Sequence, residues 1–130
     1  MDPCALRGVA VALPAASRDN QAMRSSTRLP LGEELERGPA LRDVTVNGRA
    51  VAAYTGETVA AVLLAAGITA TRRTRGGAAR GVFCGMGFCH DCLVVIDGTP
   101  NRRACVSWVR EGMAIECQDG LGAEGFAAVQ

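Results

Sequence analysis

The chain of 130 residues is 48% hydrophobic and carries 14 basic and 13 acidic residues, a formal net charge of +1. This length fits one domain with a real apolar core, and the balanced charge gives no reason to expect binding to nucleic acid or to an anionic membrane. No stretch approaches the ~18 consecutive apolar residues that span a bilayer, so direct membrane insertion is not expected. In the cytoplasm, the default location, the clustered cysteines indicate metal or redox chemistry before disulfides.

Residues 1–40 show no sustained hydrophobic period and hold four of the five prolines. We expect a disordered extension or a start codon placed too early, with Met23 as the alternative start. An N-terminal apolar run resembles a secretory signal peptide only faintly, because an acidic residue and prolines interrupt it. We therefore place the folded domain at residues 41–119 and expect an irregular tail at 120–130.

Asn47-Gly48 is the first strong turn signal, because both positions of a tight hairpin turn need positive φ angles. Apolar and polar residues alternate on both sides of it, which predicts strands at 42–46 and 49–54. The apolar face is expected to enter the core through Val44, Val46, Val51 and Ala53.

The stretch from Thr55 to Ile68 predicts the main helix. Thr55 is the expected N-cap, and Glu57 would then lie in the first turn, where a carboxylate suits the helix dipole. Gly67 is the expected stop, with Ile68 folding back onto the helix. Apolar residues recur at helical spacing at Val59, Val62, Leu63 and Ala66.

Residues 69–80 are basic and contain glycine, which predicts a solvated loop, with a docking surface for an acidic partner as the alternative. Residues 93–98 predict a strand closed by an Asp-Gly turn, and residues 113–118 predict the last strand. A hairpin, one helix, a cysteine-rich loop and further strands form an α+β pattern. A β-grasp fold, a mixed sheet with one main helix packed across it, satisfies this pattern.

Four of the six cysteines have the spacing C-x4-C-x2-C-x12-C, at Cys84, Cys89, Cys92 and Cys105. The C-x4-C-x2-C part with a later fourth cysteine is the plant-type spacing of [2Fe–2S] ligands. Such a loop must wrap a small inorganic core closely and direct backbone N–H groups at its sulfurs. Gly85 and Gly87 allow the positive φ angles and the close approach that this requires. We predict that these cysteines and glycines bind a [2Fe–2S] cluster.

Structural zinc is the main alternative, although only Cys89 and Cys92 form a tight knuckle. A redox disulfide between the same two would leave the other cysteines unexplained. A Rieske centre needs two histidines, and His90 is the only one. Cys4 is interpreted as incidental, and Cys117 as a small buried apolar side chain of the last strand.

Four further side chains near the cysteines have expected positions or roles. Arg102 and Arg103 precede Cys105, where their charge can offset that of a cluster. His90 lies between two predicted ligands and is expected at the rim of the site. Trp108, the only tryptophan, is expected to pack in the core or in an interface.

Residues 81–116 resemble the small [2Fe–2S] subunits of flavin-dependent amine and amino-acid dehydrogenases. This group includes the small subunit of hydrogen cyanide synthase, the iron–sulfur subunits of opine oxidases and of proline or hydroxyproline dehydrogenases, and the N-terminal region of sarcosine-oxidase-like α chains. The shared motifs are C-G-M-G-x-C-x-x-C from Cys84, the D-G turn after the next strand, N-x-R-A-C ending at Cys105, and R-E-G-M from Arg110.

The resemblance implies an electron-transfer subunit without substrate chemistry of its own. An FAD-dependent dehydrogenase or oxidase partner would oxidise a C–N bond, and the [2Fe–2S] cluster would relay its electrons to a downstream acceptor. The partner would face the loop around Cys89 and Cys92. The alternatives are a free-standing ferredoxin and a zinc-stabilised interaction module.

Overall fold

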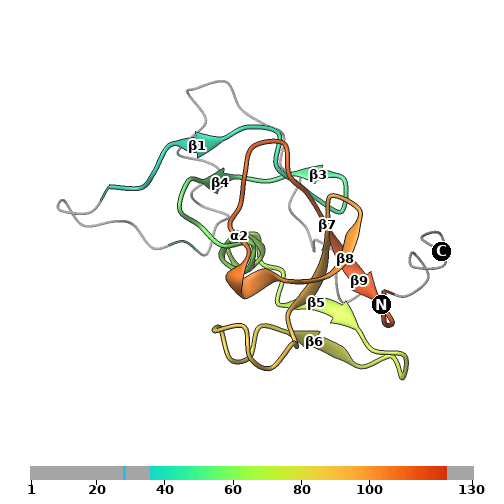
Figure 1. The fold of residues 1–130 in the computed structure, drawn as a ribbon. Helices are drawn as coiled ribbons and strands as arrows, with labels where there is room; N and C mark the ends of the chain where they lie inside the picture. The colour runs from blue at the N-terminus through green and yellow to red at the C-terminus, as the bar shows by residue number, and fades with distance from the viewer. Residues whose placement is uncertain (1–27, 29–35, 123–130) are drawn as a thin grey trace.

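The computed structural model describes Arg28 and residues 36–122, which form a mixed sheet with one helix packed against it (Figure 1). This arrangement confirms the predicted α+β, β-grasp, ferredoxin-like fold. The expectations placed on residues 1–27, the alternative start and the signal-peptide resemblance among them, lie outside the described residues.

Strand β9 (Ala114–Asp119) is the centre of the sheet. It lies between β2 (Thr45–Val46) and, at its far end, β5 (Ala70–Arg73), and runs parallel to both. It also pairs antiparallel with β7 (Leu93–Ile96). The last strand of the chain therefore joins the N-terminal hairpin to the segments on either side of the cysteines.

The predicted hairpin is present, with β2 paired antiparallel to β3 (Arg49–Ala50). Its turn has φ angles of 51° at Asn47 and 79° at Gly48, the left-handed pair that the sequence requires. The strands are shorter than predicted, because the chain leaves this ladder after Ala50. A separate two-stranded ribbon follows, formed by β1 (Ala40–Leu41) and β4 (Ala53–Tyr54).

The main helix, α2, spans Val59–Ala65, and its N-cap is Thr58, whose Oγ1 accepts a hydrogen bond from Ala61 N at 3.2 Å. The predicted N-cap at Thr55 is therefore wrong by three residues, and Glu57 precedes the helix. The cause is a tight turn: Glu57 N donates to Tyr54 O, and the Glu57 carboxylate accepts from Tyr54 N and from Arg28.

The helix ends as predicted. Gly67 has a φ of 80°, and Ile68 N donates to Leu63 O at 2.9 Å, so the chain closes the helix in a left-handed cap. Ile68 is buried beneath it.

The prediction of a solvated loop at residues 69–80 is wrong. β5 and β6 (Ala79–Gly81) form an antiparallel hairpin, whose turn is held by Thr74 Oγ1 accepting from Ala78 N at 3.0 Å. The edge of β9 recruits β5, and Thr71 is buried there. The run of arginines conceals this strand, because only Thr71 of its four residues is buried and the others are partly in contact with solvent.

Strand β7 ends in the predicted Asp-Gly turn and pairs with β8 (Thr99–Arg103), an edge strand that accommodates Pro100. The chain then enters a short 3-10 helix, η1 (Ala104–Val106). Trp108 follows with 64% of its surface exposed, so it does not pack in the core, and of its two predicted places only an interface remains.

The core lies between α2 and the sheet, and the four apolar positions predicted in the hairpin are all buried in it. The thiol-bearing residues Cys92 and Cys105 form part of the same cluster. Among the described residues, no helix is long and apolar enough to cross a membrane. The core thus reaches directly beneath the cysteine-rich end of the molecule.

Candidate metal centre

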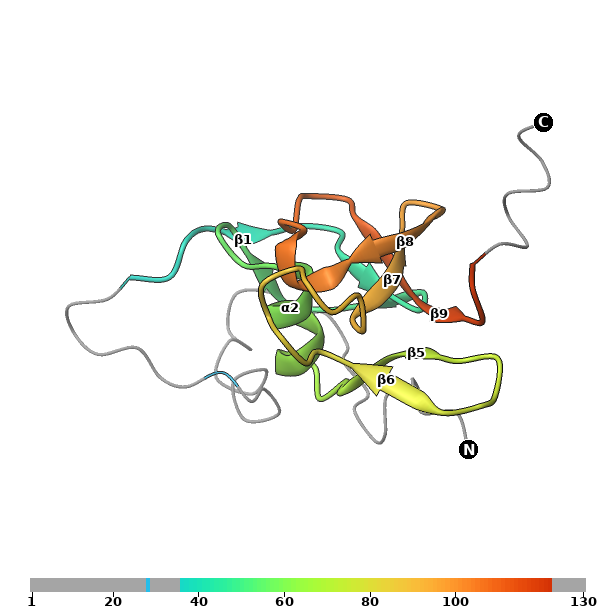
Figure 2. The same ribbon diagram turned by 60° about the horizontal axis from the view of Figure 1, so that its bottom comes forward.

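The cysteine loop, residues 82–92, joins β6 to β7 and runs past η1 (Figure 2). Its backbone curls around one sulfur. Cys84 Sγ accepts N–H groups from Met86 at 3.4 Å, Phe88 at 3.3 Å and Cys89 at 3.4 Å. A fourth bond, from Asp91 N to Cys89 Sγ at 3.4 Å, extends the pattern. A loop with this many donors aimed at sulfur stabilises the thiolate form.

The two predicted glycines contribute differently to this loop. Gly85 has a φ of 70° and open space where a side chain would begin, so only its backbone angle requires glycine. Gly87 has a φ of 82°, and a Cβ there would lie 2.9 Å from Val106 Cγ1. Gly87 is therefore also a point of close approach between the loop and η1.

The four predicted cysteines are brought to one end of the molecule as two pairs. The rim pair, Cys84 and Cys89, is half-buried, and Cys89 N donates to Cys84 Sγ. The buried pair consists of Cys92, 2% exposed at the start of β7, and Cys105, 8% exposed in η1. Cys92 and Cys84 are both near enough to the Cys105 thiol to raise its pKa. The predicted exposed rim of Cys89 and Cys92 is therefore corrected to Cys84 and Cys89.

The two pairs also differ in acidity. The backbone N–H groups of Cys89, Met86 and Phe88, in that order of effect, lower the pKa of the Cys84 thiol to about 6. Burial, and next the hydrogen bond with Cys92, raise the pKa of the Cys105 thiol. The loop thus prepares a thiolate at Cys84, whereas Cys105 favours the neutral thiol until a cation is bound.

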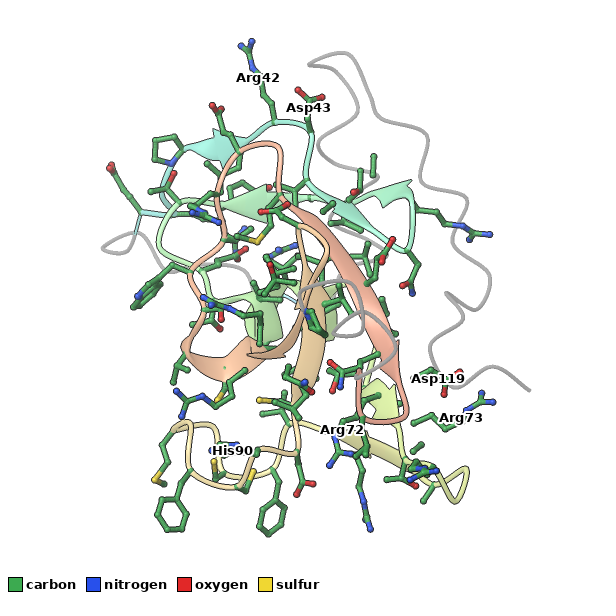
Figure 3. The ribbon with its side chains drawn as sticks, turned by 45° about the vertical axis from the view of Figure 1, so that its right-hand side comes forward. Arg42, Asp43, Arg72, Arg73, His90 and Asp119 are labelled. Carbon is green, nitrogen blue, oxygen red and sulfur yellow. The ribbon has the colours of Figure 1, made fainter. Side chains whose placement is uncertain are left out.

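Two arginines hold the loop in place. Arg103 Nη1 donates to Gly87 O at 2.6 Å, and Arg72 donates to Asp91 O at 3.0 Å and to its carboxylate Oδ1 at 3.1 Å. Figure 3 shows Arg72 and His90 at the same end of the molecule. Sequence reasoning placed Arg103 near the cysteines but took Arg72 for part of a solvated loop. Its role appears only when β5 and the cysteine loop are brought side by side.

Two cysteines, Cys117 and Cys4, are not among the predicted ligands. Cys117, on β9, packs against the core, where its Sγ lies 3.6 Å from Asn47 Nδ2 and 3.7 Å from Ala70 O. Cys4 lies outside the described residues. Within the described part of the chain, no group of three or more His, Cys, Asp or Glu side chains is arranged to hold a metal ion. A [2Fe–2S] core takes two ligands on each iron, so paired thiols are the arrangement to compare with it.

The comparisons with known proteins agree with this chemistry. Residues 42–120 match the family model described as a 2Fe-2S iron-sulfur cluster binding domain. The hydrogen cyanide synthase subunit HcnA of Pseudomonas aeruginosa is 54% identical over 78 residues, which cover 58% of this chain and 75% of that subunit. The HcnA subunit of Pseudomonas protegens is 45% identical over 73 residues, covering 56% and 70%.

One solved structure is also similar, the crystal structure of L-proline dehydrogenase from P. horikoshii, with a TM-score of 0.56 and 28% identity. The match covers 65% of this chain but only 16% of the dehydrogenase chain. The shared fold is thus a small part of that larger protein.

Proposed function

We propose, from the premise that this chain belongs to the 2Fe-2S iron-sulfur cluster binding domain family, that it is the electron-transfer subunit of a flavin-dependent dehydrogenase complex. Membership of the family means that the domain binds a [2Fe–2S] cluster. The proposed ligands are the rim pair, Cys84 and Cys89, and the buried pair, Cys92 and Cys105. Gly85 and Gly87 shape the loop around them.

The observation that carries the ligand assignment is the set of backbone N–H groups directed at Cys84 Sγ, with the other three thiols beside it. Soft thiolates are the ligands of iron–sulfur clusters, and N–H groups directed at sulfur raise the reduction potential. The pairing of thiols suggests one iron for the rim pair and one for the buried pair. Cys117, surrounded by Asn47 and Ala70, is left outside this set.

The electron-transfer role follows from what such a cluster supplies when bound: it takes up and releases one electron at a time. Two relatives are named as subunits of hydrogen cyanide synthase, and a similar domain forms a small part of an L-proline dehydrogenase chain. These names support membership of a dehydrogenase complex, and we propose that the partner is a dehydrogenase or oxidase that carries FAD and oxidises a C–N bond. We place the complex in the cytoplasm, without direct membrane insertion of this subunit.

The test is an anaerobic visible spectrum of the purified chain, with iron and sulfide assayed on the same sample. We expect a brown protein with about two irons and two sulfides per chain, bleached by dithionite. A colourless protein with about one zinc would replace this proposal with a structural module. Addition of the reduced FAD subunit should then bleach the chain without dithionite, which a free ferredoxin for another donor would not show.

A further inference from the structure

The cysteine loop carries three large apolar side chains that the fold leaves in solvent. Phe83, Met86 and Phe88 are 82%, 74% and 85% exposed. We define them as the loop tip. They lie among the proposed ligands on a single loop, whereas the apolar residues of the hairpin and of α2 are buried. Exposed apolar side chains gathered in one place mark an interaction site more often than scattered ones do.

The side chains of Met86 and Phe88 are kept in solvent by the loop backbone, whose N–H groups are hydrogen-bonded to Cys84 Sγ. Met86 N and Phe88 N both donate to Cys84 Sγ, so these amides point into the site while their side chains point out of it. Figure 3 shows the side chains of this end of the molecule projecting away from the sheet. The exposure of Met86 and Phe88 is therefore built into the arrangement that holds Cys84.

Two charged contacts beside the tip are intramolecular. The Asp91 carboxylate is paired with Arg72 at 3.1 Å, and the Arg103 guanidinium donates to Gly87 O. The surface offered by the tip itself is apolar, and these neighbouring charges are directed to contacts within the domain. A partner that fits it must present an apolar, uncharged surface, and steering by opposite charge is not the basis of recognition.

The exposed area of the tip sets the size of the contact. Side chains of this size expose roughly 400–500 Å² in total at these fractions. A standard interface buries about 800 Å² on each partner. The tip thus provides the central part of such an interface, and Val106, 43% exposed beside Gly87, adjoins it. The aromatic residues have the character of interface anchors.

We propose that the loop tip inserts into an apolar pocket of the flavin-bearing partner subunit and so fixes the rim pair against it. This inference rests on the proposed function and specifies the contact by which that subunit is held. The tip is assigned to the electron donor because Met86 and Phe88 lie between Cys84 and Cys89 and Phe83 adjoins Cys84, so an occupant of this face covers the proposed cluster site directly. Recognition by apolar anchors gives a lasting complex with little dependence on salt.

The test measures the binding of the full chain, with its cluster, to the other subunits of the Pseudomonas aeruginosa hydrogen cyanide synthase prepared without HcnA. Phe83→Ser is the principal variant, because Phe83 makes none of the hydrogen bonds to sulfur. Phe88→Ser is the second, and Leu121→Ser is the matched control, since Leu121 is 60% exposed outside the loop. Iron content and the visible spectrum are recorded for each variant.

We expect Phe83→Ser and Phe88→Ser each to raise the Kd at least about 10-fold, and Leu121→Ser less than about 2-fold. Raising the salt from about 50 to 500 mM should change the wild-type Kd less than about 3-fold. Unchanged binding by both phenylalanine variants overturns the inference but leaves the proposed function intact. No binding by the wild-type chain also overturns the inference, whereas the proposed function is decided separately by the iron and sulfide assay and by reduction with the FAD subunit. Self-association of the chain that is lost in Phe83→Ser would assign the tip to a second copy instead.

Discussion

The rim pair and the buried pair of cysteines lie at one site but in opposite environments. Backbone N–H groups surround Cys84 and lower its pKa to about 6, whereas burial raises the pKa of Cys105. The rim pair belongs to a glycine-containing loop, and the buried pair lies against the core, at the start of β7 and in η1. One half of the site depends on loop conformation, and the other depends on the fold as a whole.

This difference teaches how the site is assembled. Once the domain is folded, the sheet and η1 fix the positions of Cys92 and Cys105. The loop that carries Cys84 also needs positive φ angles and arginine contacts to keep its shape. Metal binding and folding are then coupled most strongly at Cys105, where the buried thiolate is costly without a cation.

Removal of a proposed ligand has the largest expected effect. Cys105→Ser and Cys84→Ser should each reduce iron from about two per chain to nearly none, because a cluster requires four thiolate ligands. Measuring iron, sulfide and visible absorption on each variant checks this. Cys117→Ser is the matched control and should keep its colour. Loss of colour in Cys117→Ser with retention in Cys105→Ser would reassign the fourth ligand.

Gly87→Val should distort the loop that carries Cys84 and Cys89 and lower iron binding, while the rest of the domain stays folded. The new side chain meets Val106 at 2.9 Å and occupies a φ of 82°, so we expect a cost of about 2–4 kcal/mol at the loop. Iron occupancy should fall below about half while the far-UV circular dichroism is retained. Gly85→Ala is the control, because its Cβ enters open space and should cost only about 1–2 kcal/mol. Equal iron loss in both variants would show that packing against η1 is unimportant.

Arg103→Gln should loosen the loop with a smaller effect. It removes a charged donor from Gly87 O, a bond of about 1–2 kcal/mol at a partly exposed site. We expect iron to be lost to a chelator about five to ten times faster, as followed by visible absorption. Arg102→Gln is the matched control, because successive side chains of strand β8 point to opposite faces. The same acceleration in both variants would indicate a general charge effect.

The smallest expected effect is a difference in alkylation rate between Cys84 and Cys105, measured on the chain after its cluster has been removed. With its pKa lowered to about 6, Cys84 should be alkylated by iodoacetamide at pH 7, and its rate should fall about tenfold by pH 5. The sign follows from the direction of the shift: a lowered pKa favours the folded state at high pH, and that contribution disappears as the pH falls through 6. Cys105 should react only slowly at pH 7. Peptide mass analysis distinguishes the two sites.

The parts predicted correctly from the sequence are those with local causes. The Asn47-Gly48 turn requires particular φ angles, and these appear in the structure. The stop at Gly67 and the turn after β7 have the same origin. The predicted helix start at Thr55 was wrong because Thr55 lies within the turn held by Glu57 and Arg28, so the helix begins later and Thr58 caps it.

The missed features depend on residues far apart in the sequence. β5 exists because β9 pairs with it, 46 positions away in the register Arg72 to Gln118. Arg72 reaches Asp91 across 19 positions, and Arg103 reaches Gly87 across 16. A run of arginines carries no local sign of such partners, so a solvated loop was the natural but incorrect expectation.

The sequence by itself determined the [2Fe–2S] chemistry and the fold class, because thiol spacing and turn geometry are encoded within a few neighbouring residues. Only the tertiary structure decided which cysteines form the rim, which arginines hold the loop, and that Phe83 and Phe88 stay in solvent. Burial and pairing arise when distant segments pack together, and a linear pattern does not contain those distances.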